Sequence, residues 1–548
     1  MNTIFKKLFY AFSRAERIAF ITAVVFALLS SVALGSIFVK EKTVVVPAAG
    51  GSYTEGILGQ PAYINPVTAS TEADKSLVRL IFSNLADVSD KIAVDKTGKN
   101  WDIRLKEGIR WSDGEKLTSD DVIFTIQKIQ DPDSNSPLFS GWQGVGVSRV
   151  SELELQITLG TPYSFFEQNL KDLYILPKHL FAEAAVGNWN LSKYNLQPVG
   201  SGPYSFDSYE VRDDGFITAY HLKPNKTYFA SQPLISEFSF KFFKNAPDLI
   251  SSFNSGQIDG FAVDSGQANG INRPYEEHNF FLSSYYAVFF NQGQNIALQD
   301  KNVRQALSIA VDRKTLVDEV LNGNGEERFG PVSPSLLQNG QNQQDTFSVD
   351  AANKILDDAG WTMGDSGVRQ KSIRGTEIPL EFGMVVPQIP FLQKTADDLQ
   401  NYWSAIGAKV DITVLSPEEI SADTMQNRNY ESILFGNMLN PAGDLFAFWH
   451  SSQRFYPGLN LSLYNNKKAD SLITSINQST DSLQMASDTQ SLNDMISGDY
   501  PAVFLYSPYY SYFSRKDLQG VQAGLINEQA DRLDNVDGWY LKTARSLK

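Results

Sequence analysis

The sequence predicts an exported α/β protein that follows a single N-terminal membrane helix in the chain. Residues 18–39 form one uncharged apolar run, and no second apolar run comes near the length that spans a bilayer. The remainder mixes short strands with amphipathic helices and shows no strict βαβ alternation. Its 548 residues, 42% hydrophobic and 20% charged, suffice for about two to four domain-sized units and exclude a mainly disordered chain.

The apolar run is long enough to cross a bilayer, because 22 helical residues extend about 33 Å. Four basic residues precede it and place the N-terminus in the cytoplasm, with everything after about residue 40 outside. They are Lys6, Lys7, Arg14 and Arg17. A cleaved signal peptide is the alternative, because Ala33-Leu34-Gly35 is a small-x-small site. The run is long for a signal peptide, which favours a retained anchor.

Charge and cysteine content exclude several classes of function. The net charge is -15, and residues 1–46 hold six basic and two acidic side chains, which leaves 41 basic and 60 acidic residues and a net charge of -19 on the exported body. This balance argues against a nucleic-acid partner. The chain has no cysteine. Disulfides, thiolate metal sites, cysteine nucleophiles and a lipidated cysteine are therefore excluded.

Alternation and amphipathic spacing predict the elements of the body. Strands are expected at 54–58, 101–106, 152–159, 235–243, 286–291, 380–386, 409–415 and 431–437. Helices are expected at 76–85, 119–129, 300–311, 315–323, 349–360, 390–407 and 490–499. The polar segment Gln338–Asp345 is expected to be a loop, and Val44–Tyr53 a short tether into the folded part.

Acidic residues that could suggest chemistry have simpler local explanations. Thr118 and Asp121 bracket a helix start as a capping box, and Asp312 is placed to cap the helix that follows it. The segment that starts at Asp131 resembles a calcium loop but lacks the glycine at its sixth position and the glutamate at its twelfth. It is expected to be an ordinary loop.

Catalytic signatures are equally weak. None of the four histidines, His179, His221, His278 and His450, lies within four residues of another, so no histidine metal motif is present. The sequence contains neither a P-loop nor a Rossmann glycine pattern. Gly364–Gly367 reads GDSG, as around some serine nucleophiles, but no companion histidine motif is visible and a turn is expected. The sequence predicts no catalytic residue, no metal site and no cofactor.

Several segments in order resemble the family-5 extracellular solute-binding proteins of ABC importers, of the dipeptide- and oligopeptide-binding type. The densest is LKEGIRWSDGEKLTSDDVIFTIQKI at residues 105–129. The others are 56–70, 175–181, 198–209 (PVGSGPYSFDSY), 253–261, 289–317 and 351–361. Together they extend the resemblance from about residue 52 to 541.

The resemblance implies a two-lobed, periplasmic-binding-protein-like fold of the large peptide-binding class, joined by two hinge strands and closing on its ligand. The hinges would cross near 289–291 and 503–506. The expected division is 1–17 cytoplasmic, 18–39 membrane helix, 40–52 linker, 53–290 lobe I, 291–502 lobe II and 503–548 return to lobe I.

The resemblance also implies where a ligand would bind. In the family an aspartate within a g-W-x-x-D-y-x-D-P segment meets the peptide ammonium. Here Gly436 matches, Asn437 replaces the tryptophan, Asn440 stands in place of the aspartate, and Asp444 is the nearest carboxylate. The residues expected to line the cleft are Gln60, Gly436, Asn437, Asn440, Asp444 and Tyr506.

The expected function is an anchored, extracytoplasmic binding protein that captures short peptides and delivers them to ABC permease subunits. A monomer is expected, held at the cell membrane by its N-terminal helix. The alternatives are another solute on the same fold, such as a metal chelate or oligosaccharide, an anchored hydrolase or peptidase, and a sensor or adhesion domain without an importer.

Overall fold

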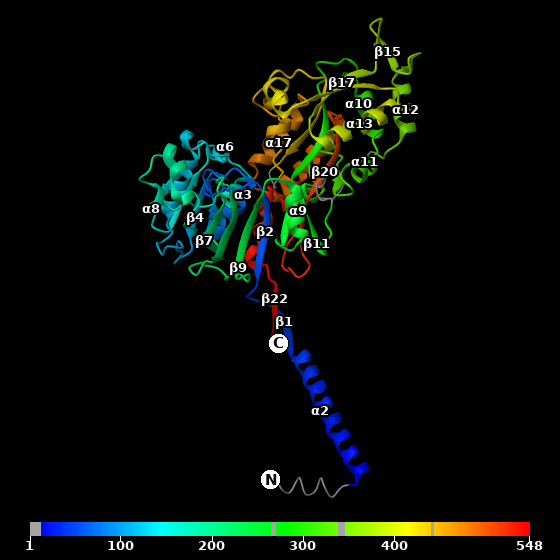
Figure 1. The fold of residues 1–548 in the computed structure, drawn as a ribbon. Helices are drawn as coiled ribbons and strands as arrows, with labels where there is room; N and C mark the ends of the chain where they lie inside the picture. The colour runs from blue at the N-terminus through cyan, green and yellow to red at the C-terminus, as the bar shows by residue number, and fades with distance from the viewer. Residues whose placement is uncertain (1–12, 265–269, 338–345, 440–442, 548) are drawn as a thin grey trace.

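The computed structural model describes residues 13–264, 270–337, 346–439 and 443–547. The polar segment 338–345 and Asn440 lie outside these ranges. Two lobes stand at one end of the molecule, a long helix extends from the other, and a narrow ribbon of two strands joins them (Figure 1).

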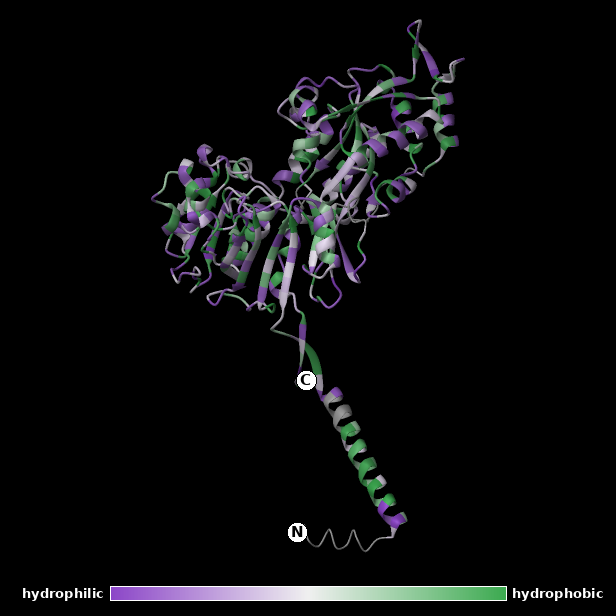
Figure 2. Cartoon of the chain, viewed as in Figure 1, coloured by the Kyte–Doolittle hydropathy of each residue, from purple (hydrophilic) through white to green (hydrophobic). Residues whose placement is uncertain are grey.

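The N-terminal helix α2 (Arg14–Lys42) is longer than the apolar run at both ends. Its segment Arg14–Leu34 is the one helix of the described residues that is long and apolar enough to cross a membrane, and none of it is buried. Figure 2 shows a hydrophobic stretch along this helix, outside the lobes, with hydrophilic residues at the end farthest from them.

The expected linker 40–52 proves to be largely regular structure. It contains the end of α2, strand β1 (Thr43–Ala48) and the start of β2 (Ser52–Leu58). β1 pairs antiparallel with β22 (Lys542–Leu547), from Thr43 opposite Leu547 to Ala48 opposite Lys542. The valine run 44–46 has high strand propensity, and its partner comes from the other end of the chain.

Lobe I, the part built around the first hydrophobic core, contains two sheets. In the large sheet the order is β7-β8-β9-β2-β10-β20, and β11 also pairs with β20. These strands are β7 Tyr204–Val211, β8 Ile217–Pro224, β9 Glu237–Phe243, β10 Gly260–Asp264, β11 Tyr275–Leu282 and β20 Ala502–Arg515, with β21 Leu525–Ile526 beside β11. The small sheet has the order β3 Ser89–Val94, β4 Asn100–Leu105, β6 Glu154–Thr158 and β5 Gly146–Arg149.

Helices cover the sheets of lobe I. α3 (Glu72–Ile81) contacts β2 and β7, whereas α9 (Ala246–Asn254) contacts β2, β9 and β10 and carries a separate core with Phe261 and Phe513. The remaining helices are α4 Leu85–Val88, α5 Ser119–Ile129, α6 Phe139–Trp142, α7 Phe166–Asp172 and α8 Lys178–Phe181.

Lobe II is a sheet with a core on each face. Its order is β18 Lys409–Leu415, β17 Glu381–Pro387, β19 Ser432–Met438, β12 Ser284–Phe290 and then β20. Along β12 the side chains alternate, so that Val288 joins one core and Phe289 the other. The first core is covered by α10 Lys301–Ile309, α11 Arg313–Val320, α12 Val349–Asp358 and α13 Pro390–Ser404. The second is covered by α16 Phe446–Trp449, α17 Lys467–Gln478 and α18 Ser482–Asp499.

Shorter elements complete lobe II. They are β13 Gly325–Glu327, β14 Thr362–Met363, β15 Arg369–Ile373, β16 Thr376–Pro379, α14 Pro417–Glu419 and α15 Met425–Asn427. The GDSG segment is the turn between β14 and β15, where the Gly367 amide donates to the Gly364 carbonyl at 3.0 Å. The predicted turn is therefore confirmed.

One strand, β20, serves both lobes. Its first part pairs with β12 of lobe II, with Ala502 opposite Phe289. Its second part pairs with β10 and β11 of lobe I, with Phe513 opposite Phe261. The two sheets are therefore joined through a single continuous backbone. The lobe boundaries expected from the resemblance stay predictions.

The eight predicted strands are all present, within a few residues at their ends. Six of the seven predicted helices also occur at their positions, and 490–499 is the second half of α18. The helix expected at 76–85 is displaced to Glu72–Ile81, because the Thr71 hydroxyl accepts the Asp74 amide and starts the helix earlier. The capping box of Thr118 and Asp121 and the cap at Asp312 are confirmed.

The GSGP segment of the sequence packs against the end of α3. A Cβ atom added to Gly200 would lie 1.9 Å from the Ile81 carbonyl oxygen, and one added to Gly202 would lie 2.7 Å from the Ile81 carbonyl carbon. The Gly202 amide donates to that same oxygen at 2.8 Å. These glycines allow two backbone segments to touch, which gives this motif a structural role.

Candidate functional site

Three of the predicted site residues lie near the ends of strands from both lobes. Gln60 follows the carboxyl end of β2 in lobe I, and Gly436 and Asn437 lie near the carboxyl end of β19 in lobe II. Gln60 is exposed, and its Oε1 accepts the Ile217 amide at 2.7 Å. Its side chain thereby fixes the loop after β2 to strand β8.

Gly436 and Tyr506 meet through Tyr286. A Cβ atom on Gly436 would lie 2.7 Å from the Tyr286 ring, so this glycine makes room for the ring on the neighbouring strand. The Tyr286 and Tyr506 ring centroids are 5.7 Å apart. Tyr506 is fully buried and shares a 2.7 Å hydrogen bond with the Thr395 hydroxyl, and burial raises its pKa. The Tyr506 side chain is part of the lobe II core.

Asn437 points to the other face of β19. Its side chain is 3% exposed, and its Nδ2 donates to the Tyr285 hydroxyl at 2.8 Å. The Trp449 indole donates to the same oxygen at 3.0 Å. These contacts satisfy buried polar groups within lobe II.

Asp444 lies where the two lobes touch. Its Oδ2 accepts the Tyr163 hydroxyl of lobe I at 2.9 Å, and its Oδ1 accepts the Phe446 amide at 2.8 Å and the Asn477 side chain at 3.2 Å. Beside it, the Ser164 hydroxyl donates to the Ile476 and Ser479 carbonyls, both at 2.7 Å. The half-buried Asp444 carboxylate is therefore part of the contact between the lobes.

The structure thus brings Gly436 and Tyr506 together and places Asp444 at the contact between the lobes. Gln60 is engaged with β8, Asn437 faces a core, and Asn440 lies outside the described residues. The ligand roles of all six residues stay predictions.

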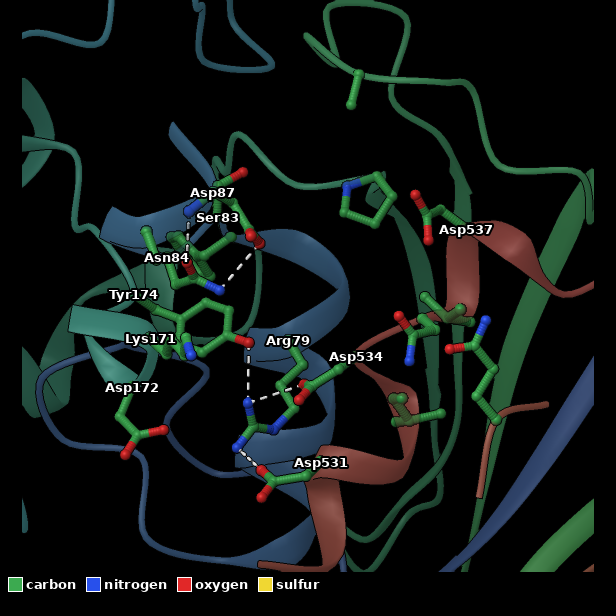
Figure 3. A pocket seen from close by; sticks show the side chains of 18 of the residues that line it. Arg79, Ser83, Asn84, Asp87, Lys171, Asp172, Tyr174, Asp531, Asp534 and Asp537 are labelled. Carbon is green, nitrogen blue, oxygen red and sulfur yellow. Dashed lines mark hydrogen bonds and ion pairs between the residues drawn. The ribbon is translucent and has the colours of Figure 1, made fainter. Parts of the chain in front are cut away.

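A cavity of about 800 Å³ lies elsewhere, within lobe I, and none of the six predicted residues lines it. It is bounded by α3, α4, α7 and the C-terminal return from Gln522 to Asp537, and its volume falls in the range of small-molecule sites (Figure 3). Its charged lining residues are Arg79, Lys106, Lys171, Asp87, Asp172, Asp531, Asp534 and Asp537.

Arg79 is the centre of this charged lining. Its Nη1 donates to the Tyr174 hydroxyl at 2.9 Å and to Asp534 at 3.1 Å, and its Nη2 donates to Asp531 (Figure 3). The same Nη2 also donates to Glu528 at 2.8 Å. Burial raises the pKa of two nearby carboxyls in spite of Arg79, that of Asp172 to about 6 and that of Asp534 to about 7.

One feature of the sequence could have indicated this cavity, although the sequence analysis did not predict it. Asp531, Asp534 and Asp537 recur at every third residue in the C-terminal tail, and all three line it. Arg79 is 452 residues away from Asp531 in sequence, so the pairing depends on the fold.

Lobe I is expected to lose stability as the pH rises from about 4 to 7. The folded state holds the protons of Asp172 and Asp534 to higher pH than the unfolded chain, in which an aspartate titrates near 3.9. Ionising these two buried carboxyls destabilises the folded state. This destabilisation is absent below the pKa of an aspartate in the unfolded chain and is complete above about pH 7. Because the Asp534 side chain is 48% exposed, solvent screens part of this effect.

Thermal unfolding of the full chain at pH 5.5 and 8.0 measures this dependence. Asp534→Asn should reduce the difference in midpoint, and Asp365→Asn, in the exposed turn of β14 and β15, should leave it unchanged. An undiminished difference in Asp534→Asn would contradict the assignment.

Comparisons with known proteins give the family. The sequence model described as "Bacterial extracellular solute-binding proteins, family 5 Middle" matches residues 84–455. The chain is 26% identical over 535 residues to the oligopeptide-binding protein AppA of Bacillus subtilis, covering 91% of this chain and 93% of that protein.

Solved structures agree in fold. AppA of Bacillus subtilis in complex with a nonapeptide superposes with a TM-score of 0.64 at 25% identity, covering 91% of this chain and all of that one. NikZ of Campylobacter jejuni in complex with Ni(L-His) gives a TM-score of 0.68 at 24% identity, covering 89% and 99%. These findings confirm the resemblance and the two-lobed fold class. The chain belongs to the bacterial extracellular solute-binding proteins of family 5.

Proposed function

We propose that this protein is the membrane-held binding component of an ABC importer and that it captures short peptides between its lobes. The observation that carries the proposal is the similarity to an oligopeptide-binding protein over nearly the full length of both chains. The family consists of solute-binding proteins and not of enzymes, so the GDSG turn needs no catalytic role.

Peptide capture in this arrangement would use the strand ends of both lobes. A peptide laid against a sheet edge is held by main-chain hydrogen bonds, which tolerate many side chains. Closure of two lobes around such a ligand is a shift of an existing equilibrium. The contact of Tyr163 with Asp444 shows that the lobes already meet through polar side chains that a ligand could replace.

Membrane attachment is the second part of the proposal. The chain has no cysteine that could carry a lipid, and α2 is long and apolar enough to serve instead. A retained helix would keep the body on the outer face, next to permease subunits. Detection of the N-terminal residues 1–17 on the membrane-bound mature protein by mass spectrometry tests this, and a mature chain that starts after Gly35 would refute it.

Native mass spectrometry of the purified full-length protein tests the ligand. We expect a heterogeneous set of co-purifying masses that fragment as short peptides. A single mass that fragments as an oligosaccharide, or as a metal chelate such as the Ni(L-His) bound in the Campylobacter jejuni structure, would overturn the peptide proposal.

Asp444→Asn is expected to weaken binding of free-amine peptides by about 10- to 100-fold while changing N-acetylated peptides little. The reason is that a carboxylate attracts an ammonium as its counter-ion, whereas an amide oxygen accepts the hydrogen bond without a charge of its own. Isothermal titration with paired peptides measures both affinities.

Tyr163→Phe is the matched control, because it removes the hydrogen bond to Asp444 and keeps the carboxylate. It should affect both peptides to the same small extent. Equal losses for the two peptides in Asp444→Asn would show that Asp444 serves only the contact between the lobes.

A further inference from the structure

The ribbon of β1 and β22, here called the stalk, is largely exposed to solvent. All six residues of β22 are exposed, and Val44, Val45 and Leu547 are 42%, 58% and 78% exposed. A two-stranded ribbon is marginally stable in water on its own. The stalk is therefore a surface that would gain stability from a second contact.

The stalk begins where the apolar helix ends. α2 continues without a break to Lys42, and Thr43 already belongs to β1. The pairing of Thr43 with Leu547 returns the C-terminal end of the chain to the same level, as Figure 1 shows. If residues 18–39 span the hydrocarbon core, the first residues of β1 and the last residues of β22 lie at the height of the lipid headgroups.

The charge at this level is opposite to that of the body. Lys40 and Lys42 lie on the last turn of α2, with Glu41 between them, and Arg545 of the stalk donates to the Thr43 hydroxyl at 3.0 Å. Lys542 lies at the other end of the stalk, opposite Ala48. Residues 47–548 together carry 41 basic and 60 acidic side chains. Basic side chains at a bilayer surface are attracted to anionic lipids, and an acidic body is repelled by them.

We propose that the membrane end of the stalk docks on anionic phospholipid headgroups of the outer leaflet, through Arg545, the adjoining Lys40 and Lys42 of α2, and the exposed Val44, Val45 and Leu547. The acidic lobes would be held away from the same surface, so the stalk would set the height and tilt of the receptor. This proposal rests on the retained anchor of the proposed function.

The absence of cysteine in the chain allows a site-specific probe. Leu547→Cys labelled with an environment-sensitive fluorophore is placed, as the full-length chain, in nanodiscs of phosphatidylcholine alone or with 30% phosphatidylglycerol. We expect blue-shifted emission in the anionic discs, and reversal of this shift at high salt.

Lys42→Gln/Arg545→Gln should then lower the docked population by roughly fivefold for each charge removed. Lys96→Gln/Lys301→Gln removes two exposed charges from the lobes and should leave the emission unchanged. Because Val46 and Ala544 are opposite each other, a disulfide between cysteines at these positions, in a chain without the probe, reports whether the stalk still forms in each variant.

Equal emission in the two lipids, or equal losses in the two double variants, would overturn the docking proposal. Emission that shifts only when another protein is added would show that the stalk binds a protein. That result would also overturn the docking proposal. Release of the mature chain from membranes by cleavage after Gly35 would instead refute the anchor, a result that is read independently of the fluorophore.

Discussion

Arg532→Met is expected to destabilise lobe I by about 3–5 kcal/mol, the largest effect of a single side chain that this structure predicts. The Arg532 and Glu55 side chains are 1% and 0% exposed, and Arg532 Nη2 and Nε lie 2.8 and 3.1 Å from the Glu55 carboxylate. Removing the guanidinium leaves that carboxylate buried without its counter-ion. Burial alone already raises the pKa of Glu55, which shows how unfavourable the site is for an isolated charge.

The effect of the unpaired Glu55 charge is isolated by comparing Arg532→Met in the wild-type chain with Arg532→Met in a Glu55→Gln chain. A glutamine still accepts the hydrogen bond that the Tyr512 hydroxyl donates to Glu55 at 2.8 Å, but it has no charge to leave unpaired. The second substitution should therefore recover much of the loss. Hydrogen exchange of the β2 amides measures the local opening free energy in each variant. A change below about 1 kcal/mol in the single variant would contradict the prediction.

Gly200→Ala is expected to cost about 3 kcal/mol or more and to reduce the yield of folded protein. The added methyl group would lie 1.9 Å from the Ile81 carbonyl oxygen, a backbone atom that cannot rotate away. Relief requires separating the segment from the end of α3, which also breaks the hydrogen bond from Ser112 to the Gly200 carbonyl at 2.8 Å. Chemical unfolding monitored by circular dichroism gives the magnitude.

Gly187→Ala is the control for the same chemical change at an open position, because no heavy atom lies within 4 Å of its Cβ position. It should change stability by less than about 0.5 kcal/mol. If Gly200→Ala matched this control, the close approach of the two backbones would not be a constraint on the fold.

Local elements of this fold could be predicted because their signals are local. The strand 101–106 alternates in sequence, and β4 shows the corresponding burial of Trp101, Ile103 and Leu105. The capping box at Thr118 lies within four residues. Pairings between distant segments could not be predicted in this way: β1 finds β22 across nearly the whole chain, and only the fold makes them neighbours.

The candidate site illustrates the same limit. Alternation along β19 predicts that Gly436 and Asn437 face opposite sides, but which side is filled depends on Tyr286 and Tyr285 of β12. The charged cavity depends on Arg79 and Asp534, which no spacing rule connects. The ligand residues expected from the resemblance stay predictions, and the structure shows the packing that occupies Asn437 and Tyr506.

Lobe I is built from two segments at opposite ends of the chain. This arrangement imposes an order on how the protein can fold after export. Its sheet needs β20, and its core needs Trp539, whose ring lies 5.9 Å from that of Tyr53. Lobe II has most of its strands and helices within one continuous stretch and can begin to form sooner. The first part of lobe I emerges first from the export channel, but its fold has to wait for residues 502–541. Its exposed strands are then most open to proteases and to mispairing while translocation is still in progress.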